Sequence, residues 1–270
     1  EENCRVKIFT IPNKSNSPKR SRAAEWGRKC LAALFWLALW QVLYLAVQQE
    51  ILIVSPVRAF GRLLELAGEA EFWITAFSSM LRIVSGFLLG VVAGTLLAAL
   101  TSVSRLLYDV FHPMISIVKA TPVASFILLA LVWIESPYVP VFTAFLMVLP
   151  VVWGNVSNGI AKTDRNLLQM AEVYQFGIAK TIRRIYLPSI MPYFTAACTT
   201  GMGLAWKAGV AAEVLANTKR SIGGNIYNAK IYIETADLFA WTAVVIVISV
   251  LLEKLMMRLM KTVGKKYNLS

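Results

Sequence analysis

The sequence predicts an all-α, polytopic membrane protein with six transmembrane helices. Of its 270 residues, 57% are hydrophobic and only 16% are charged, whereas soluble domains carry about 45–50% apolar and about 25% charged residues. The apolar residues gather in runs of about 20, the length that a helix needs to cross a bilayer. This composition argues against a soluble enzyme, a disordered protein and a disulfide-stabilised scaffold. The three cysteines are scattered and lack the spacing of a metal site.

Six apolar runs form the predicted spans, at about residues 30–47, 74–101, 107–134, 137–156, 188–210 and 238–258. The second and third runs are long enough to break into two pieces. Pro122 lies inside the third run, where it frees the carbonyl of Val118 and can kink the helix. The runs define a transmembrane domain over residues 30–260. A basic cytoplasmic tail expected to be disordered, residues 1–29, precedes it, and a short cytoplasmic tail, residues 261–270, follows it.

The distribution of Lys and Arg predicts that both termini lie in the cytoplasm. With the N-terminus inside, the cytoplasmic segments are residues 1–29, 102–109, 157–187 and 253–270. These hold 19 of the 27 basic residues but only seven of the 15 acidic residues. Because short basic loops are retained in the cytoplasm, the net charge of +12 indicates topology and not a nucleic-acid partner. The first run follows a basic region, as in a signal peptide, but no convincing small-x-small cleavage site follows it.

Segment 48–73 is predicted to form a short amphipathic helix on the extracytoplasmic side. Ser55 suits an N-cap and Pro56 suits the first helical position. Apolar residues follow at helical spacing, at positions 57, 60, 63, 64 and 67. This helix either anchors the chain at the membrane interface or contacts an extracytoplasmic partner.

The cytoplasmic segment 159–187 is predicted to form a helix, a break and a second helix. Asp164 can cap the first helix, whose apolar positions are Leu167, Leu168, Ala171 and Tyr174. Gly177 can break it, and a basic helix then leads into the fifth span at Pro188. The segment is either an ordinary amphipathic surface loop or a projection to which a soluble partner binds.

This segment resembles the cytoplasmic loop of ABC importer permeases, whose pattern is Glu-Ala-Ala, three residues, Gly, nine residues, Ile-x-Leu-Pro. Ile185, Leu187 and Pro188 match the end of the pattern, and Ala171 matches its second Ala. Gln175 stands at the Gly position, and Gln169 and Met170 stand at the Glu and first Ala positions. Segments 119–134, 145–150, 203–215 and 221–242 also resemble the nitrate/sulfonate/taurine branch of these permeases.

The resemblance implies the fold of a type I ABC importer permease with a cytoplasmic coupling helix. It implies two ATPase subunits that bind ATP and Mg, an extracytoplasmic substrate-binding protein, and a second permease copy, identical or related, in a bacterial inner membrane. By position, the coupling helix covers about residues 165–176. The ATPase-coupling residues are expected to be Gln169, Met170, Ala171, Glu172, Val173, Tyr174, Gln175, Phe176 and Gly177.

The chain itself is expected to have no catalytic, cofactor or metal site. It lacks the G-x-x-x-x-G-K-[ST] phosphate loop, and the sequence at 177–181 has neither the second glycine nor the preceding strand of one. If transport uses ATP, the ATPase is therefore expected to be another chain. A bound nucleic acid is not expected either.

Four residues are candidates for the translocation path: Lys119, Thr121, Lys207 and Glu213. A charge at membrane depth is costly and marks a functional site by default. Lys207 and Glu213 are six residues apart, so they do not share a helix face, and small residues from Ala205 to Ala212 would allow close helix packing. The alternative is that Lys207 and Glu213 lie at the outer interface while Lys119 extends toward the inner one.

His112, the only histidine, is expected to be a hydrogen-bonded interfacial residue, since no Cys or carboxylate cluster accompanies it. Asn155 and Asn158 could hydrogen-bond between helices. The function that these observations predict is an importer permease that moves a small, anionic or vitamin-like solute by alternating access. The alternatives are an ATP-independent secondary transporter or channel, and a scaffold that anchors a soluble complex.

Overall fold

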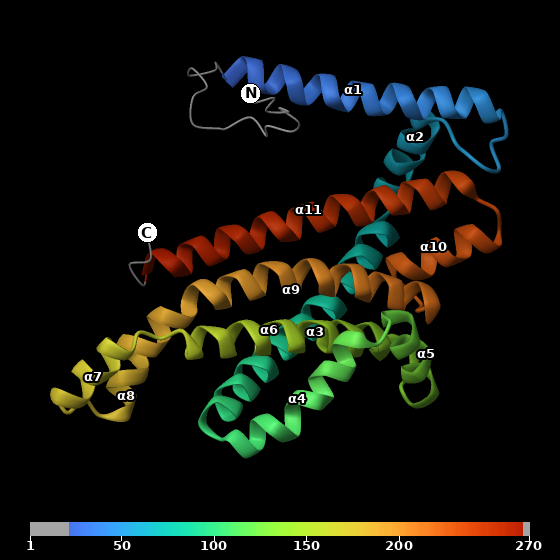
Figure 1. Cartoon of the computed structure of the whole chain (residues 1–270). Coiled ribbons are helices and arrows are strands. Elements are labelled where there is room, and N and C mark those ends of the chain that lie inside the picture. The colour runs from blue at the N-terminus through green and yellow to red at the C-terminus, as the bar shows by residue number, and fades with distance from the viewer. Residues whose placement is uncertain (1–21, 267–270) are drawn as a thin grey trace, which may run out of the picture. The chain divides into compact units, whose positions relative to one another are not determined.

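The computed structural model of the chain describes residues 22–266, which are helical apart from short connections and contain no β-strand. The chain divides into two compact units, Glu1–Pro56 and Val57–Ser270. Figure 1 shows α1 of the first unit and the helices of the second. The all-α, multi-helical architecture that the sequence predicts is confirmed.

The first unit contains one long helix, α1 (Arg22–Val47). Its segment Cys30–Val47 is apolar enough to cross a membrane, which agrees with the first predicted span. The indole nitrogen of Trp40 donates a hydrogen bond to the Val54 carbonyl at 3.1 Å and fixes the chain that leaves the helix. Because α1 begins at Arg22, residues 22–29 are helical, and the helix is longer than predicted. The rest of the predicted tail lies outside the described residues.

The second unit is a bundle of helices joined by short connections. Its elements are α2 (Pro56–Ala67, which begins at the boundary), α3 (Ala70–Val103), α4 (Arg105–Ala120), α5 (Val123–Trp133), the 3-10 helix η2 (Ser136–Tyr138), α6 (Val139–Ala161), α7 (Arg165–Val173), α8 (Ile178–Thr181), the π-helical turn η3 (Ile182–Tyr186), α9 (Leu187–Leu215), α10 (Ile222–Ile231) and α11 (Thr235–Lys266). Since α11 continues to Lys266, it takes up more than half of the predicted C-terminal tail at 261–270.

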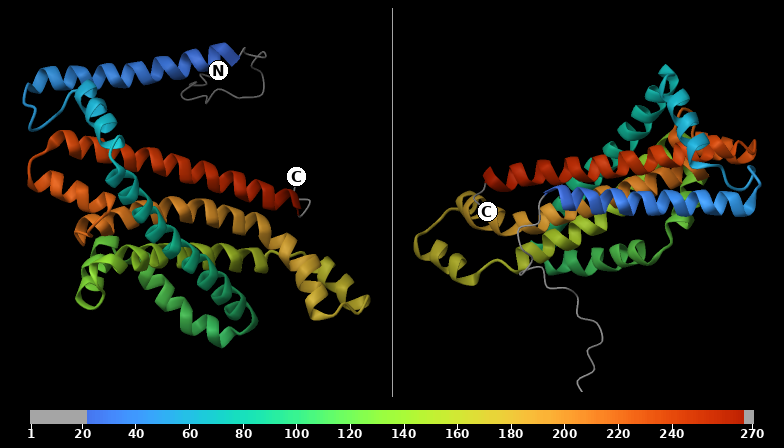
Figure 2. Two further views of the ribbon diagram at one scale, coloured as in Figure 1. Left: turned by 180° about the vertical axis from the view of Figure 1, so that it is seen from behind. Right: turned by 90° about the horizontal axis from the view of Figure 1, so that it is seen from above.

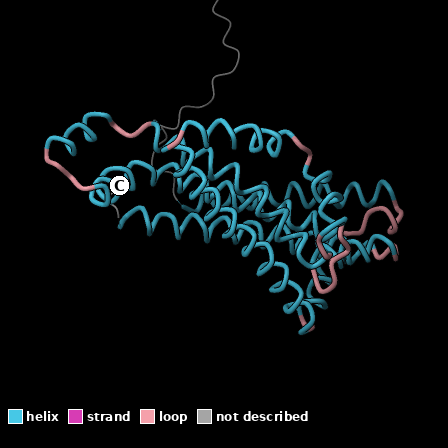
Figure 3. Tube along the Cα trace, turned by 90° about the horizontal axis from the view of Figure 1, so that it is seen from below, coloured by secondary structure: helices cyan, strands magenta, loops and turns pink. Residues whose placement is uncertain are grey.

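The helices of this unit present two distinct ends. The α7 end carries α7, α8 and the C-terminal end of α11, whereas the α10 end carries α10, α5 and the start of α11 (Figures 1 and 2). Figure 3 shows that loops and turns gather at the helix ends. The bundle therefore separates two surfaces that different partners can contact.

Close packing of α3 on α6, and of α6 on α9, forms the core. Ile83, Val148, Ala205 and Trp206 are fully buried there. The indole nitrogen of Trp206 donates to the Val245 carbonyl of α11 at 3.1 Å, so this large side chain also satisfies its polar atom. The small residues predicted to allow close packing in α9 do so: Ala205, Ala208, Gly209 and Ala212 are buried.

A glycine stripe on α3 allows α6 to approach, a feature absent from the sequence-based predictions. A Cβ atom built on Gly86 would lie 2.3 Å from the Val141 carbonyl oxygen, and one on Gly90 would lie 2.8 Å from the Val148 Cβ. Gly94 is equally crowded, with the Leu149 carbonyl oxygen at 2.9 Å. The spacing of four residues keeps all three on one helix face, as in small-residue interfaces of membrane helices.

The predicted count of six spans is not confirmed. Four helices in residues 22–266 are long and apolar enough to cross a membrane: Cys30–Val47, Ala70–Val103, Ser136–Ala161 and Thr235–Thr262. The third predicted span breaks at Thr121–Pro122, where α4 and α5 meet at 107° and would together supply a fifth crossing. The fifth predicted span lies in α9, which has 29 residues but interrupts its apolar residues with Gly, Ser, Thr and charged residues.

The amphipathic helix predicted after Ser55 is present as α2. Ala59 and Leu66 are buried, whereas Val57 and Phe60 are exposed. Arg62 joins the helix to α11, with Nε and Nη2 donating to Asp237 at 2.5 and 3.1 Å. This hydrogen bond, with a second one to Glu65, raises the pKa of the Arg62 guanidinium. The guanidinium therefore stays charged, and its contacts with Asp237 hold α2 against α11.

Candidate functional site

The helix predicted in segment 159–187 is α7, which projects from one end of the bundle (Figure 1). Asp164 is its N-cap, as predicted, and its side chain accepts a hydrogen bond from the Asn166 amide at 2.8 Å. Ala171 is buried and faces the rest of the protein. The remaining surface of α7 is free to contact another molecule.

Gln175, and not Gly177, reverses the chain after α7. The Gln175 amide donates to the Glu172 carbonyl at 2.9 Å, and the Phe176 amide donates to the Ala171 carbonyl at 2.8 Å. These two bonds form a Schellman motif, whose turn residue needs a left-handed backbone and is usually glycine. Gln175 adopts this conformation with φ of 48°. The prediction of a break at Gly177 was wrong by two residues, because Gly177 has φ of −64° and caps α8.

This conformation supports the register of the loop motif. The Gly position of the ABC permease pattern falls on Gln175, and there the backbone adopts the conformation that glycine favours. The mismatch in residue type therefore leaves the turn itself intact.

Exposed apolar side chains form the tip of the projection. Val173 is 80% exposed and Tyr174 is 70% exposed. The Lys180 ammonium lies 3.9 Å from the centroid of the Phe176 ring and holds the two sides of the turn together. The other expected coupling residues divide between exposed positions (Gln169, Met170, Glu172, Gln175 and Gly177) and the buried Ala171.

The projection is continuous with the core. Residues 178–215 form one uninterrupted helical path through α8, η3 and α9. Ile185, the first matched residue at the end of the loop motif, is buried within it. Beyond η3, α9 packs on α3, α6, α10 and α11.

A cavity of about 490 Å³ lies among α3, α4 and α6, and we call it the α4–α6 cavity. Polar and aromatic side chains dominate its wall, and none of its lining residues is acidic. Lys119 supplies its positive charge, with Nζ lying 5.6 Å from the centroid of the Trp153 ring. The hydroxyl oxygen of Ser157 is buried there without a hydrogen-bond partner. Unpaired donors without carboxylates suit an anion.

Of the four path candidates, Lys119 alone lines this cavity. Thr121 caps α4 instead, and its hydroxyl donates to the Ile117 carbonyl at 2.8 Å. Lys207 is exposed on α9, and Glu213, six residues further along the same helix, is fully buried. The structure therefore does not bring the four residues together within one chain.

Glu213 joins three elements at the α10 end. Its carboxylate accepts hydrogen bonds from the Ser79 hydroxyl at 2.9 Å and from the Gly223 amide at 3.1 Å. The Arg82 guanidinium lies 3.8 Å from its second oxygen. Ser79 in turn accepts from the Ile222 amide at 2.9 Å. These contacts fix the first turn of α10 against α3 and α9.

The remaining polar candidates find local partners. His112 packs against the rings of Tyr108 and Trp153, with centroids 5.2 and 6.1 Å away, and lines the α4–α6 cavity. Asn155 donates to the Val151 carbonyl of its own helix at 2.8 Å, and its side chain makes no hydrogen bond to another helix within residues 22–266. Asn158 lines the cavity. Sequence spacing did not reveal the cavity, because its wall combines α3, α4 and α6.

A comparison with known protein families shows to which family this chain belongs. The family described as "Binding-protein-dependent transport system inner membrane component" matches residues 86–268. The chain belongs to this family. The match begins within α3 and covers α4 through α11, so it includes the projecting α7, and it confirms the resemblance to ABC importer permeases.

Relatives of this permease support the same branch. The nitrate import permease protein of Synechocystis is 24% identical over 70% of the chain and 71% of its own length. The taurine transport system permease protein of Escherichia coli is 22% identical over 79% and 80%. The bicarbonate transport system permease protein of Synechococcus elongatus is 23% identical over 58% and 57%.

Family membership settles the general role of the chain. It is a multi-pass inner-membrane component of a binding-protein-dependent ABC importer. Such a component is the permease and not the ATPase, so the importer also contains ATPase and substrate-binding subunits.

Proposed function

We propose that this permease forms the translocation path for a small anion. In this proposal it works as a dimer, of two identical or related copies, with two ATPase subunits at the α7 end and a substrate-binding protein at the α10 end. The α7 end is cytoplasmic, as are both termini, because the basic loops of the sequence favour that orientation. ATP and Mg bind to the ATPase subunits, and this chain needs no cofactor of its own.

The projection at α7 is the observation that carries this proposal. It presents Val173 and Tyr174 to solvent although both are apolar or aromatic, and such exposed side chains mark a contact surface when they cluster. The helical path of residues 178–215 connects that surface to the core. ATPase closure would therefore move α7 and α9 together and reopen the path toward the outside, a coupling through rigid elements with two arrangements.

The α4–α6 cavity supports an anionic substrate. Lys119 and the unpaired Ser157 hydroxyl provide positive charge and donors, and no carboxylate opposes them. Relatives named for nitrate, taurine and bicarbonate transport agree with this class. We propose that Lys119 contacts the anion on its way to the cytoplasm. Lys207 is proposed to line the path where two copies meet, while Thr121 and Glu213 shape the helices around it.

Substitution of Tyr174 tests the coupling surface. Tyr174→Ala is expected to lower both the retention of the ATPase subunits during purification and ATP-driven uptake in proteoliposomes. Tyr138→Ala is the matched control, because Tyr138 is also largely exposed, at 62% against 70% for Tyr174, but lies in the connection between α5 and α6 and not at the α7 tip. Equal ATPase retention by both variants would show that α7 is not the docking helix.

ATPase assays test the division of labour between subunits. The purified permease is expected to hydrolyse no ATP, whereas the complex with its ATPase subunits is expected to be active. Hydrolysis by the permease alone, at a rate comparable to that of the complex, would contradict the assignment.

A further inference from the structure

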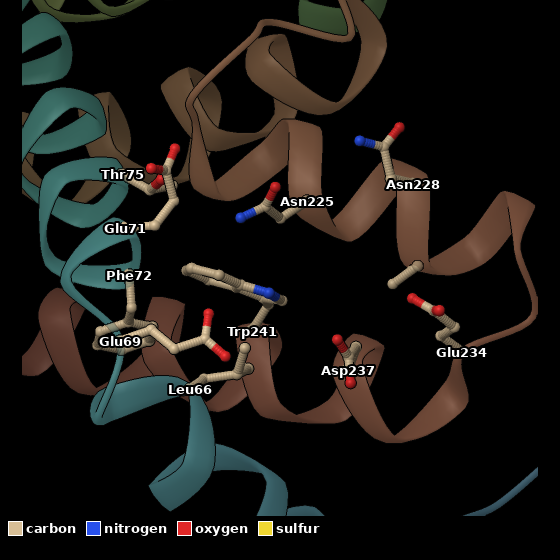
Figure 4. A pocket seen from close by; sticks show the side chains of 11 residues that line it. Leu66, Glu69, Glu71, Phe72, Thr75, Asn225, Asn228, Glu234, Asp237 and Trp241 are labelled. Atoms are coloured by element: carbon tan, nitrogen blue, oxygen red, sulfur yellow. The ribbon is translucent and has the colours of Figure 1, made fainter.

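An acidic pocket of about 180 Å³ lies at the α10 end, enclosed by α2, α3, α10 and α11. Four carboxylates surround it, those of Glu69, Glu71, Glu234 and Asp237. Figure 4 shows Glu69 and Asp237 on either side of Trp241, with Glu234 beyond Asp237. No feature of the import cycle described above uses this pocket.

The negative charge of the acidic pocket is only partly compensated. Asp237 pairs with Arg62, and Glu71 lies 3.7 Å from the Arg220 guanidinium. Glu69 and Glu234 have no side-chain hydrogen bond or ion pair with any residue in the range 22–266. Two carboxylates therefore remain to attract a positive group.

A largely buried threonine on the pocket wall provides independent evidence for a ligand. Thr75 is only 2% exposed and lines the pocket, yet its side chain makes no hydrogen bond among the described residues. Other threonines inside these helices donate to the carbonyl four residues back, as Thr95 and Thr143 do. The Thr75 oxygen is not among the fully buried unpaired atoms, so it opens onto the pocket without a protein partner, and a ligand with N–H donors would satisfy it.

The size and lining of the pocket favour a single cationic side chain. Sites for drug-sized ligands usually measure about 300–1,000 Å³, which exceeds this pocket. Phe72 and Trp241 are largely buried and form its apolar floor, with ring centroids 5.1 Å apart. The acidic residues do not converge on a point that could hold a metal ion within the described part of the chain. An aliphatic stem over aromatic rings, with a cationic head between carboxylates, matches the chemistry of Lys or Arg.

The surface beside the pocket resembles a protein interface. Tyr232 and Ile233, which precede Glu234, are 72% and 64% exposed. Ile233 has φ of 61°, a left-handed conformation that is unfavourable for a β-branched residue. The combination of exposed apolar residues with an acidic recess is typical of a contact site for a basic partner.

We propose that the acidic pocket receives a Lys or Arg side chain of the substrate-binding protein when that protein docks. This inference rests on the proposed function, which places the binding protein at the α10 end. It adds the receiving residues on the permease and the charge of the group that the binding protein inserts.

The test uses the full importer complex in nanodiscs and its own binding protein. Glu69→Gln combined with Glu234→Gln is expected to weaken binding of the loaded binding protein about tenfold at low salt. The variant is also expected to flatten the salt dependence of that binding, while ATPase activity without binding protein stays unchanged. Glu135→Gln is the matched control, because it removes an exposed carboxylate that does not line the pocket.

The outcomes are separable. Wild-type affinity and salt dependence in the double variant would overturn the inference. The inference would also be overturned if the double variant bound the binding protein with wild-type affinity but lost a rise in unfolding temperature that methylammonium causes in the wild-type complex. That result would indicate a site for free amines. Failure of the wild-type complex to bind any binding protein would instead contradict the proposed function.

Discussion

At the scale of single residues, Gln175 and Glu213 show which details a sequence reveals. The Asp164 cap of α7 could be predicted because the cap and its partner are two residues apart. The partners of Glu213 could not, since Ser79 is 134 residues away and meets it only through helix packing. Gln175 lies between these cases: the loop motif marks its position as one for glycine, but the left-handed backbone becomes visible only in the structure.

Gln175→Gly is expected to stabilise the turn after α7. A side chain in the left-handed region costs about 1–2 kcal/mol, which glycine avoids. The variant is expected to raise the unfolding temperature of the purified permease slightly and to keep transport activity. Gln175→Val should lower that temperature, because a β-branched residue tolerates this conformation poorly. Gly177→Ala, at negative φ, serves as control. A lower unfolding temperature for Gln175→Gly would contradict the Schellman turn.

Loss of Ser79 or Glu213 is expected to destabilise the permease. Glu213→Ala leaves the Ser79 hydroxyl and the Gly223 amide without their buried acceptor, and an unsatisfied buried polar group costs about 1–3 kcal/mol. Thermal unfolding of the detergent-solubilised protein measures the effect. Lys207→Ala, which removes an exposed charge on the same helix, should shift stability by about 0.5 kcal/mol or less. Similar shifts for both variants would mean that the Glu213 contacts do not hold α10.

At the scale of helices, the apolar pattern predicted where helices lie in the sequence better than how they bend and pack. It located the projection at α7 and the helix α2, and Pro122 marked the place where the third span breaks. The angle of 107° between α4 and α5 could not be predicted from the sequence. It depends on Ile127 and Ala130 of α5, which pack against Val139 and Ala212. The glycine stripe on α3 could have been found from its four-residue spacing, although its partner α6 could not.

Gly90→Leu is expected to prevent close packing of α3 on α6. Even a Cβ atom there would approach the Val148 Cβ to 2.8 Å, and overpacking of a core typically costs about 1–3 kcal/mol or more. Reduced yield of folded protein in size-exclusion chromatography is the expected result. Gly61→Ala on α2 has open space around it and should be neutral or stabilising. Normal yield of the Gly90 variant would show that the helices are further apart.

At the scale of the whole molecule, two cavities of the second unit differ in charge. The α4–α6 cavity carries Lys119 and no carboxylate, whereas the acidic pocket carries four. Composition and the count of basic residues predicted the membrane class, and the loop motif predicted the family. Neither predicted the cavities, since each is enclosed by helices that are far apart in sequence.

Lys119→Gln is expected to slow uptake of an anionic substrate by about tenfold, because a charged group in a low-dielectric channel raises the local concentration of its counter-ion. Uptake of labelled substrate by proteoliposomes measures this effect, with basal ATPase activity unchanged. Lys254→Gln removes an exposed lysine from α11 and should leave uptake intact. Equal uptake by both variants would remove Lys119 from the path.

The most direct test of the importer assignment is uptake by proteoliposomes that contain the permease and its ATPase subunits. Labelled nitrate, taurine and bicarbonate are the probes, with ATP inside or outside and with or without the binding protein. We predict accumulation of one probe only when ATP faces the α7 end and the loaded binding protein faces the α10 end. Equal uptake without ATP would contradict this account and would favour a secondary transporter or channel.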